Sequence, residues 1–211
     1  MTSFWIVPLA AVALAQVAVL ATSMYLHRAL AHRSVVVHPA ANLLFRAVLW
    51  LTTGQDRREW VAVHRFRRFA SDIREDRLDR AVFSRGSIGL ALGATLLCLV
   101  LGLWQGLIAG SVHAVLYVFV LAPLINGLGH WRGAQNFSNT AYNSPVLAWV
   151  TAGESLHNNH HAYPRLPKFS VRWFEFDPSW LVIRALATVG LLVITGTPAT
   201  PAGSGAPSGE P

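Results

Sequence analysis

Apolar residues are clumped along this chain rather than spread evenly. Three long apolar runs stand out, at residues 4–26, 86–103 and 107–125. A helix of such length crosses the hydrocarbon core of a bilayer, which is roughly 30 Å thick. Only residues 104–106 separate the second run from the third, so these two are expected to form a hairpin. The pattern predicts an all-α integral membrane protein with about three transmembrane helices.

Two further apolar segments contain an arginine and are predicted to lie at the interface or against protein. Residues 40–53 include Arg46, and a crossing there would carry the arginine-rich segment 57–85 to the opposite side of the membrane. We therefore expect an interfacial helix over 40–53. Residues 176–196 form a last apolar helix, with Arg184 in its first half.

The chain is predicted to be one membrane domain followed by a tail. Residues 1–196 contain all the apolar segments, whereas residues 197–211 are rich in Pro, Gly and Ser. A segment of that composition is expected to be disordered. The lone cysteine, Cys98, lies inside a predicted span, so no disulfide is expected.

Charge is sparse and strongly asymmetric. Lys and Arg outnumber Asp and Glu by 17 to 10, and only 13% of residues are charged. The basic residues concentrate in the segments 27–35, 57–85 and 126–175, which the positive-inside rule places in the cytoplasm. These segments are predicted to form a cytoplasmic, histidine-rich cap on a multi-pass protein of a bacterial-type plasma membrane. Topology thus explains the positive charge, so the expected partner is the lipid bilayer and no nucleic acid is expected.

Seven of the nine histidines fall within the three cap segments and are predicted to meet at one membrane face. Imidazole is a common ligand for iron, copper and zinc. In the stretch HNNHH (157–161), the i, i+3, i+4 spacing puts three rings on one side of a helix. His27 and His32 are about 140° apart round an ideal helix and need a helix end or a bend to share a metal. His38 is expected to be a turn residue, and the mid-span His113 a packed side chain.

Four ordered stretches resemble the motifs of the membrane fatty acid desaturases of the acyl-CoA (stearoyl-CoA) type. They are YLHRALAHRS (25–34), EWVAVHR (59–65), INGLGHWRG (125–133) and GESLHNNHHAYP (153–164). The resemblance implies a di-iron centre that uses O2 to introduce a double bond into a fatty acyl chain, carried on CoA or on a lipid. It also implies a separate electron carrier, such as a ferredoxin or a cytochrome b5-like protein. Carried over by position, the implied metal ligands are His27, His32, His64, His130, His157, His160 and His161, with Asn126 binding through water.

One motif departs from the family's pattern. Where the second box of the family reads H-x-x-H-H, this chain has arginine at two ligand positions, Arg67 and Arg68. A protonated guanidinium has no lone pair for a metal, so the departure puts catalytic competence in question. An internal deletion just after His64 or Arg65 is preferred over two point substitutions as the explanation. On that hypothesis residues 65–83 form a polar amphipathic helix, and the two arginines lie on its solvated face.

Three alternative functions remain open from the sequence. A lipid hydroxylase of the histidine-box superfamily would use the same residues and differ in its product. A non-catalytic desaturase remnant or regulatory membrane protein would keep the spans without the chemistry. A haem-binding membrane protein would place paired histidines within spans, where only His113 lies.

Overall fold

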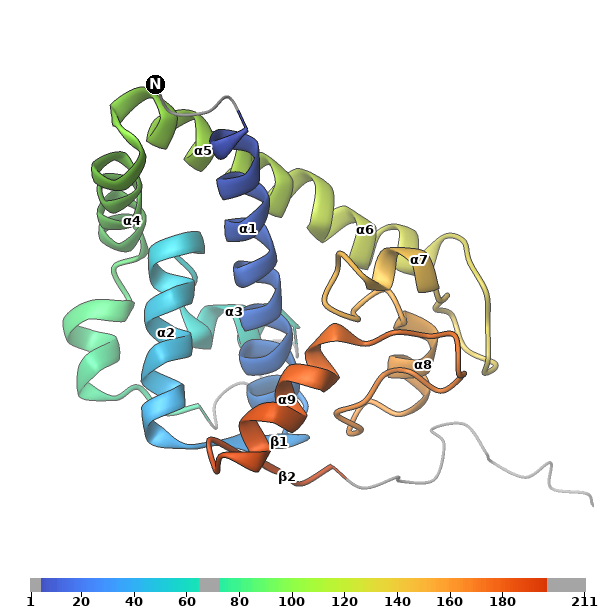
Figure 1. Cartoon of the computed structure of the whole chain (residues 1–211). Helices are drawn as coiled ribbons and strands as arrows, with labels where there is room; N and C mark the ends of the chain where they lie inside the picture. The colour runs from blue at the N-terminus through green and yellow to red at the C-terminus, as the bar shows by residue number, and fades with distance from the viewer. Residues whose placement is uncertain (1–4, 65–72, 197–211) are drawn as a thin grey trace, which may run out of the picture.

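The structure is a computed structural model, and it describes residues 5–64 and 73–196. The tail predicted over 197–211 lies outside these residues. Helices dominate the described part, as predicted, and Figure 1 shows their arrangement. The elements in chain order are α1 (Ile6–Ala21), the π-helical η1 (Thr22–Ala31), β1 (Val35–Val37), α2 (Pro39–Thr53), α3 (Arg57–His64), the π-helical η3 (Asp79–Phe83), α4 (Gly86–Leu101), α5 (Leu103–Val115), the π-helical η4 (Leu116–Leu121), α6 (Ala122–Asn126), the 3₁₀ turn η5 (Leu128–His130), α7 (Pro145–Ala148), α8 (His157–Ala162), α9 (Pro178–Thr188) and β2 (Leu192–Ile194).

All three predicted spans are helical. Within the described residues, two helices are long and apolar enough to cross a membrane, Ile6–Ala31 and Leu103–His130. The remaining predicted span is α4, which is apolar but shorter, at 16 residues. The turn predicted at 104–106 is wrong, because the chain reverses at Gly102 and Trp104 already lies within α5. Gly102 has a φ of 95°, a conformation that favours glycine.

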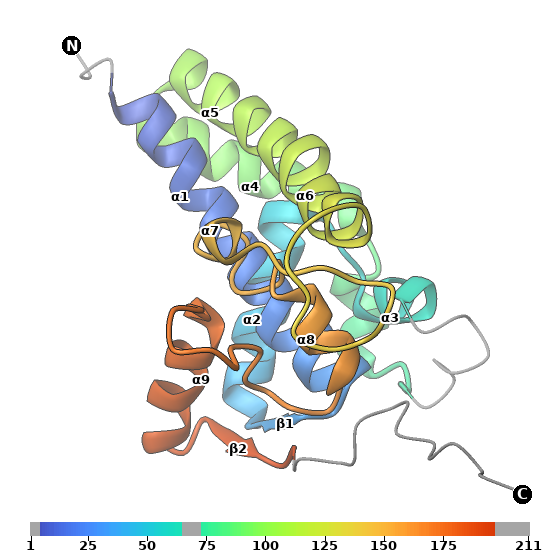
Figure 2. The ribbon, with the colours of Figure 1, turned by 90° about the vertical axis from the view of Figure 1, so that its right-hand side faces the viewer.

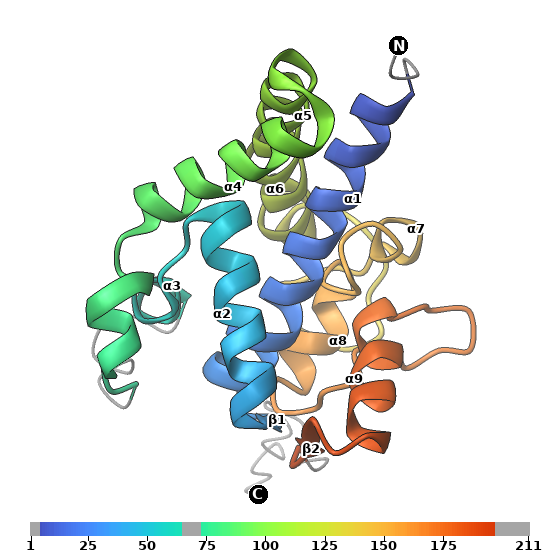
Figure 3. The same cartoon turned by 60° about the vertical axis from the view of Figure 1, so that its left-hand side comes forward.

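Glycines let α2 pack closely against α4. Figure 3 shows α2 lying beside both α1 and α4. A Cβ added at Gly89 or Gly93 would clash with the backbone carbonyls of Trp50 or Leu51. Small residues of this kind allow two helix backbones to approach without a bulky side chain between them. The helix predicted over 40–53 is therefore present as α2.

Arg46 of α2 is buried in a cluster of ion pairs. Its guanidinium donates to Asp76 at 2.7 and 3.0 Å and to Asp79 at 2.6 Å. Arg57, the first residue of α3, donates to Asp79 at 2.6 Å as well. The hydrogen bond from Arg46 is the largest of the effects that hold the pKa of Asp76 at about 2. The cluster ties α2, α3 and η3 together and satisfies a charge that would otherwise be costly to bury.

The polar helix predicted over 65–83 is only partly present. Its first part, with Arg67 and Arg68, lies outside the described residues. Residues 74–76 are not helical. A new helical turn starts where the Asp76 side chain accepts a hydrogen bond from the backbone N–H of Asp79 at 2.8 Å. Such a side-chain cap begins a helix rather than continuing one, so within the described residues the predicted helix is wrong over 73–76 and present over 77–83.

A short antiparallel strand pair, which was not predicted, closes the lower end of the fold. β1 pairs with β2, and Val36 lies opposite Val193. The last helix, predicted over 176–196, is wrong beyond Thr188, where α9 ends. Gly190 then turns the chain at a φ of 75°. The β-branched residues of β1 favour an extended backbone, and pairing with them draws the end of the apolar segment into a strand.

The surroundings of the first long helix change along its length. Its exposed large apolar side chains end at Val17, whereas almost every residue from Thr22 to Ala31 is buried by protein. Tyr25 and Leu26 belong to the main core, with Phe45 of α2 and Ile183 of α9. Figure 2 shows α8, α9 and the strand pair gathered around this lower half. We call these surrounding elements, together with α3 and α7, the cap, which thus includes α9 and β2 in addition to helices of the predicted cap segments.

Candidate metal centre

A π-helical stretch brings the first two site histidines together. Over Thr22–Ala31 the helix has wider turns, and the backbone N–H of His32 donates to the carbonyl of His27 at 2.9 Å. Hydrogen bonds between residues five apart place those residues one above the other. The ring centroids of His27 and His32 are consequently 4.7 Å apart. The sequence analysis required a bend or a helix end for His27 and His32 to share a metal. The change from α-helical to π-helical winding meets that requirement.

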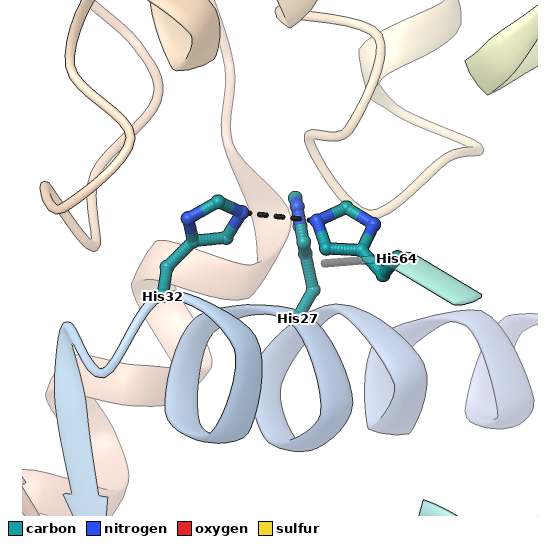
Figure 4. A group of neighbouring side chains, drawn as sticks. All are labelled: His27, His32 and His64. Carbon is teal, nitrogen blue, oxygen red and sulfur yellow. Dashed lines mark hydrogen bonds between the residues drawn. The ribbon is translucent and has the colours of Figure 1, made fainter. Parts of the chain in front are cut away.

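Two more histidines join this pair from other elements. His64, the last residue of α3, places its Nε2 atom 3.1 Å from Nε2 of His32, as Figure 4 shows. One ring nitrogen each of His27, His32 and His64 lies within 4.8 Å of the others. The ring of His160, from α8, lies 4.5 Å from that of His27 and 4.6 Å from that of His32. We call these four residues the first histidine group.

The other three histidines form a second histidine group. His157 and His161 come from α8, and His130 comes from η5. The Nε2 atom of His157 lies 3.1 Å from Nε2 of His130 and 3.2 Å from Nε2 of His161. Two nitrogens that each bind one metal at about 2.1 Å are about 3.0–3.4 Å apart at ordinary coordination angles. The observed spacing therefore fits a shared metal ion.

Helix α8 contributes to both groups. His160 faces the first group, whereas His157 and His161 face the second. The rings of His157 and His160 are 6.0 Å apart between centroids, so the two groups are neighbours. The prediction that three rings of HNNHH share one side is refined, because only the i, i+4 pair belongs to the same group.

A cavity of about 140 Å³ lies between the groups. Its lining includes His27 and His64 from the first group, His157 from the second, and Asn126. The Asn126 amide donates to the carbonyl of Ala122 at 3.2 Å. Asn126 thus lies at the wall of the cavity and outside both histidine groups.

A buried carboxylate that the sequence analysis missed contacts His27 of the first group. Glu154 Oε2 lies 2.7 Å from Nδ1 of His27, and its Oε1 accepts a hydrogen bond from the Ser23 hydroxyl. Burial raises the pKa of Glu154, while the nearby Arg28 guanidinium opposes that rise. A carboxylate at Nδ1 fixes the proton on that nitrogen and leaves the Nε2 lone pair for a metal. The sequence did contain a signal for Glu154, because it is the acidic residue of the motif GESLHNNHH.

The two asparagines of HNNHH hold α8 in place. The side-chain oxygen of Asn158, which is fully buried, accepts from the backbone N–H groups of Asn136 and Phe137. Asn159 donates to the Glu175 carboxylate at 2.8 Å. Because buried amides satisfied in this way rigidify their surroundings, these bonds fix the direction in which the neighbouring histidines point.

The α8 imidazoles are held in the neutral form that binds metals. Burial lowers the pKa of His157 to about 4 and takes the pKa of His160 well below its ordinary value. Burial, together with His130, also lowers the pKa of His161. The Nδ1 atoms of His157 and His160 are buried without a hydrogen-bond partner among the described residues. Neutral imidazoles whose lone pairs converge at close range fit a cation at their centre.

Two predicted non-ligand histidines lie away from both groups. His38 caps α2, where its Nδ1 accepts from the backbone N–H of Ala40 at 3.3 Å. His113 is buried, and its Nε2 lies 2.8 Å from the carbonyl oxygen of Thr52 on α2. Both predictions, a turn residue and a packed side chain, are confirmed.

Two long apolar helices and two groups of converging imidazoles indicate a helical membrane protein able to hold metal ions. A family model described as fatty acid desaturase matches residues 65–188, more than half of the chain. The chain belongs to the fatty acid desaturase family. The matched region includes the whole second histidine group and His160 of the first.

Individual relatives are similar over parts of their length. The sn-1 stearoyl-lipid 9-desaturase of Synechocystis sp. is 30% identical over 131 residues, which cover 59% of this chain and 39% of the relative. The sn-2 palmitoyl-lipid 9-desaturase of Nostoc sp. is 34% identical over 48% of this chain and 36% of the relative. A probable acyl-CoA desaturase of Schizosaccharomyces pombe is 35% identical over 41% of this chain and 18% of the relative. The chain thus spans well under two thirds of these relatives.

Proposed function

We propose that this chain is a fatty acyl desaturase-type oxidoreductase, which introduces a double bond into a fatty acyl chain with O2 as co-substrate. The observation that carries the proposal is the convergence of seven histidines, from ordered motifs, into two groups beside one cavity. Membership of the desaturase family and the similarity to lipid- and CoA-linked desaturases support it.

In this proposal the metal is iron, with one ion held by each histidine group. Asn126, at the cavity wall, would bind iron through a water molecule. When bound, the two irons supply the O2 activation that removal of hydrogen from an unactivated acyl chain requires. The protein's own residues hold neutral imidazoles in place, and Glu154 keeps the Nδ1 proton of His27 directed away from the metal.

The cavity between the groups is the proposed place for the reacting part of the acyl chain. Besides its histidines it is lined by apolar side chains such as Val19, Leu121 and Ile125. Such a lining favours methylene groups over water. Tyr117 closes one side, with its hydroxyl 2.6 Å from that of Thr22.

The proposed substrate is a fatty acyl group carried on CoA or on a lipid, and it enters from the bilayer. Electrons come from a separate carrier such as a ferredoxin or a cytochrome b5-like protein. The formal net charge of +7, concentrated in the cap segments, would attract an acidic carrier. In the proposed topology the cap faces the cytoplasm of a bacterial-type plasma membrane, and the protein crosses it several times.

The arginines at the second box limit the proposal to the ligands that remain. Arg67 and Arg68 replace two expected histidines and lie outside the described residues. The first group nevertheless contains four imidazoles without them, and the second contains three. We therefore propose that both metal sites can be filled. The alternative, a non-catalytic remnant, would instead be indicated by metal-free protein in the experiment below.

The experiment is anaerobic purification in detergent, followed by metal analysis and an optical spectrum. We expect two irons per chain and no Soret band. His157→Ala should lower the metal content, whereas His38→Ala, which lies outside both groups, should not. Metal-free protein with intact helical content would overturn the proposal in favour of a remnant, and a Soret band would indicate haem.

A second measurement identifies the product. The chain is expressed in a host that lacks the corresponding unsaturated acyl groups, and the total fatty acids are analysed. New unsaturated chains are expected from the parent and not from His157→Ala. Hydroxylated chains instead would identify the lipid hydroxylase, and an unchanged profile with the protein present in the membrane would count against catalysis.

A further inference from the structure

The segment that joins α7 to the metal centre lies alongside both long apolar helices. Gln16 of α1 donates through Nε2 to the backbone carbonyl of Val150 at 3.1 Å. Ala152 packs in one cluster with Val19 of α1 and Leu121 of η4. These partners belong to the stretches predicted to span the bilayer. Val150 and Ala152 therefore lie beside those stretches, although the sequence places them in a cytoplasmic segment.

The outward side of this segment is apolar. Val146 and Trp149 are 80% and 61% exposed, and Val150 is exposed beside them. The inward residues, Ala148 and Thr151, are fully buried. Exposed positions at i, i+3 and i+4 form one face of a helical turn. One side of the turn therefore packs on protein while the other presents apolar groups outward, as in elements that lie on a membrane.

A second segment extends this face. The ring of Phe176 stacks on that of Trp149, with centroids 4.0 Å apart. Just before it, Trp173 is 95% exposed, Phe174 is also exposed, and the basic Arg172 is adjacent. Figure 3 shows the loop before α9 projecting away from the helices. We call these side chains the aromatic patch: Val146, Trp149, Val150, Trp173, Phe174 and Phe176.

We propose that the aromatic patch inserts into the headgroup region of the bilayer leaflet nearest the cap, so that the cap is seated on the membrane. The occupant is phospholipid, because Val150 of the patch is hydrogen-bonded through its carbonyl to Gln16 of α1, a helix that itself exposes apolar side chains such as Val12 and Val17. Trp and Phe beside Arg match the chemistry of that layer, where apolar rings meet phosphate. The proposal rests on the membrane placement of the long helices and not on the proposed activity.

Site-directed spin labelling in phospholipid nanodiscs tests the proposal. In a Cys98→Ser background, single labels are placed at Val146→Cys and Trp173→Cys, and their collision rates with O2 and with a water-soluble nickel chelate are compared. Leu107→Cys on α5 is the lipid-facing reference, and Arg80→Cys is the water-facing reference. We expect both patch labels to collide with O2 as the position 107 label does. Their collision rate with the nickel chelate should be severalfold lower than at position 80.

Two results would overturn the proposal. Nickel collision rates at positions 146 and 173 equal to that at position 80 would mean that the patch faces water. Immobile labels shielded from both O2 and nickel would mean that protein, such as a second copy of the chain, covers it. Trp173 is almost fully exposed, so its replacement leaves the packing intact if Val146→Cys fails to fold. Neither readout depends on bound metal.

Discussion

The clearest test of the metal centre is removal of the Glu154 carboxylate. This side chain is buried, lies 2.7 Å from Nδ1 of His27 and accepts a hydrogen bond from Ser23. Its direct contact with the first histidine group is through His27. We expect its effect on a metal to act mainly through the protonation and orientation of His27.

The expected loss of metal affinity differs between two substitutions of Glu154, to Gln and to Ala. Glu154→Gln keeps an oxygen that can accept the Nδ1 proton but removes the charge, so metal affinity should fall about 10-fold, which is about 1.4 kcal/mol. Glu154→Ala also removes the acceptor, and affinity should fall about 100-fold. The alanine variant further leaves the buried Arg28 with one carboxylate partner, Asp177, at 3.0 Å. Loss of a partner from such a buried cluster costs about 3 kcal/mol of folding stability.

Equilibrium dialysis against iron at graded chelator concentrations measures the affinity, and thermal unfolding in detergent measures the stability. Glu75→Gln is the matched control, since this glutamate pairs only with the surface residues Arg58 and Arg80 within the described ion pairs. If both Glu154 variants bind iron as tightly as the control, then the orientation of His27 does not depend on this carboxylate and the reasoning is wrong.

Four further predictions address the rest of the site and fold. His32→Ala and His161→Ala should each lower the iron content from two to one per chain, because they belong to different groups; metal analysis checks this. Asn159→Leu should lower the free energy of unfolding by about 3 kcal/mol, because the buried Asn143 amide, the Phe169 carbonyl and the Glu175 carboxylate each lose a hydrogen bond; chemical denaturation measures it. Asp76→Asn should lower the unfolding temperature at neutral pH. Since the pKa of Asp76 is depressed from 3.8 to about 2, this difference should be present above about pH 5 and vanish as the pH falls toward 2. Gly93→Val should disrupt the α2–α4 contact and reduce the folded yield, which gel filtration reports.

The sequence was informative where composition alone decides the structure. Long apolar runs predicted the helices α1, α4 and α5, because only helices satisfy the backbone over such stretches in lipid. The approximate meeting of the histidines followed from the distribution of basic residues along the chain. The roles of His38 and His113 were also predictable, since a residue before proline and a polar group within a span have few alternatives.

The features that were missed all depend on contacts between distant segments. β2 exists because the valines of β1 offer it a partner more than 150 residues away in sequence, and a local pattern of apolar residues gives no sign of that. Glu154 gains its role from His27, which is remote along the chain, and Asn159 gains its role from Glu175, which lies beyond the end of α8. The division of HNNHH between two groups depends on where η5 and the end of α3 lie, and spacing within one helix cannot supply that.

Because Thr22–Ala31 is π-helical, the winding of this helix also sets the distance between the rings of His27 and His32. In an ordinary α-helix, positions five apart point about 140° away from each other, so His27 and His32 face one another only while the wider winding persists. Any event that rewinds this stretch by one residue would separate the two imidazoles without breaking a bond or unfolding the core. Conversely, a metal ion bound by both histidines would stabilise the wide turns of the π-helix. Metal binding in the cap would thereby affect the winding of the first long helix, which is predicted to span the membrane.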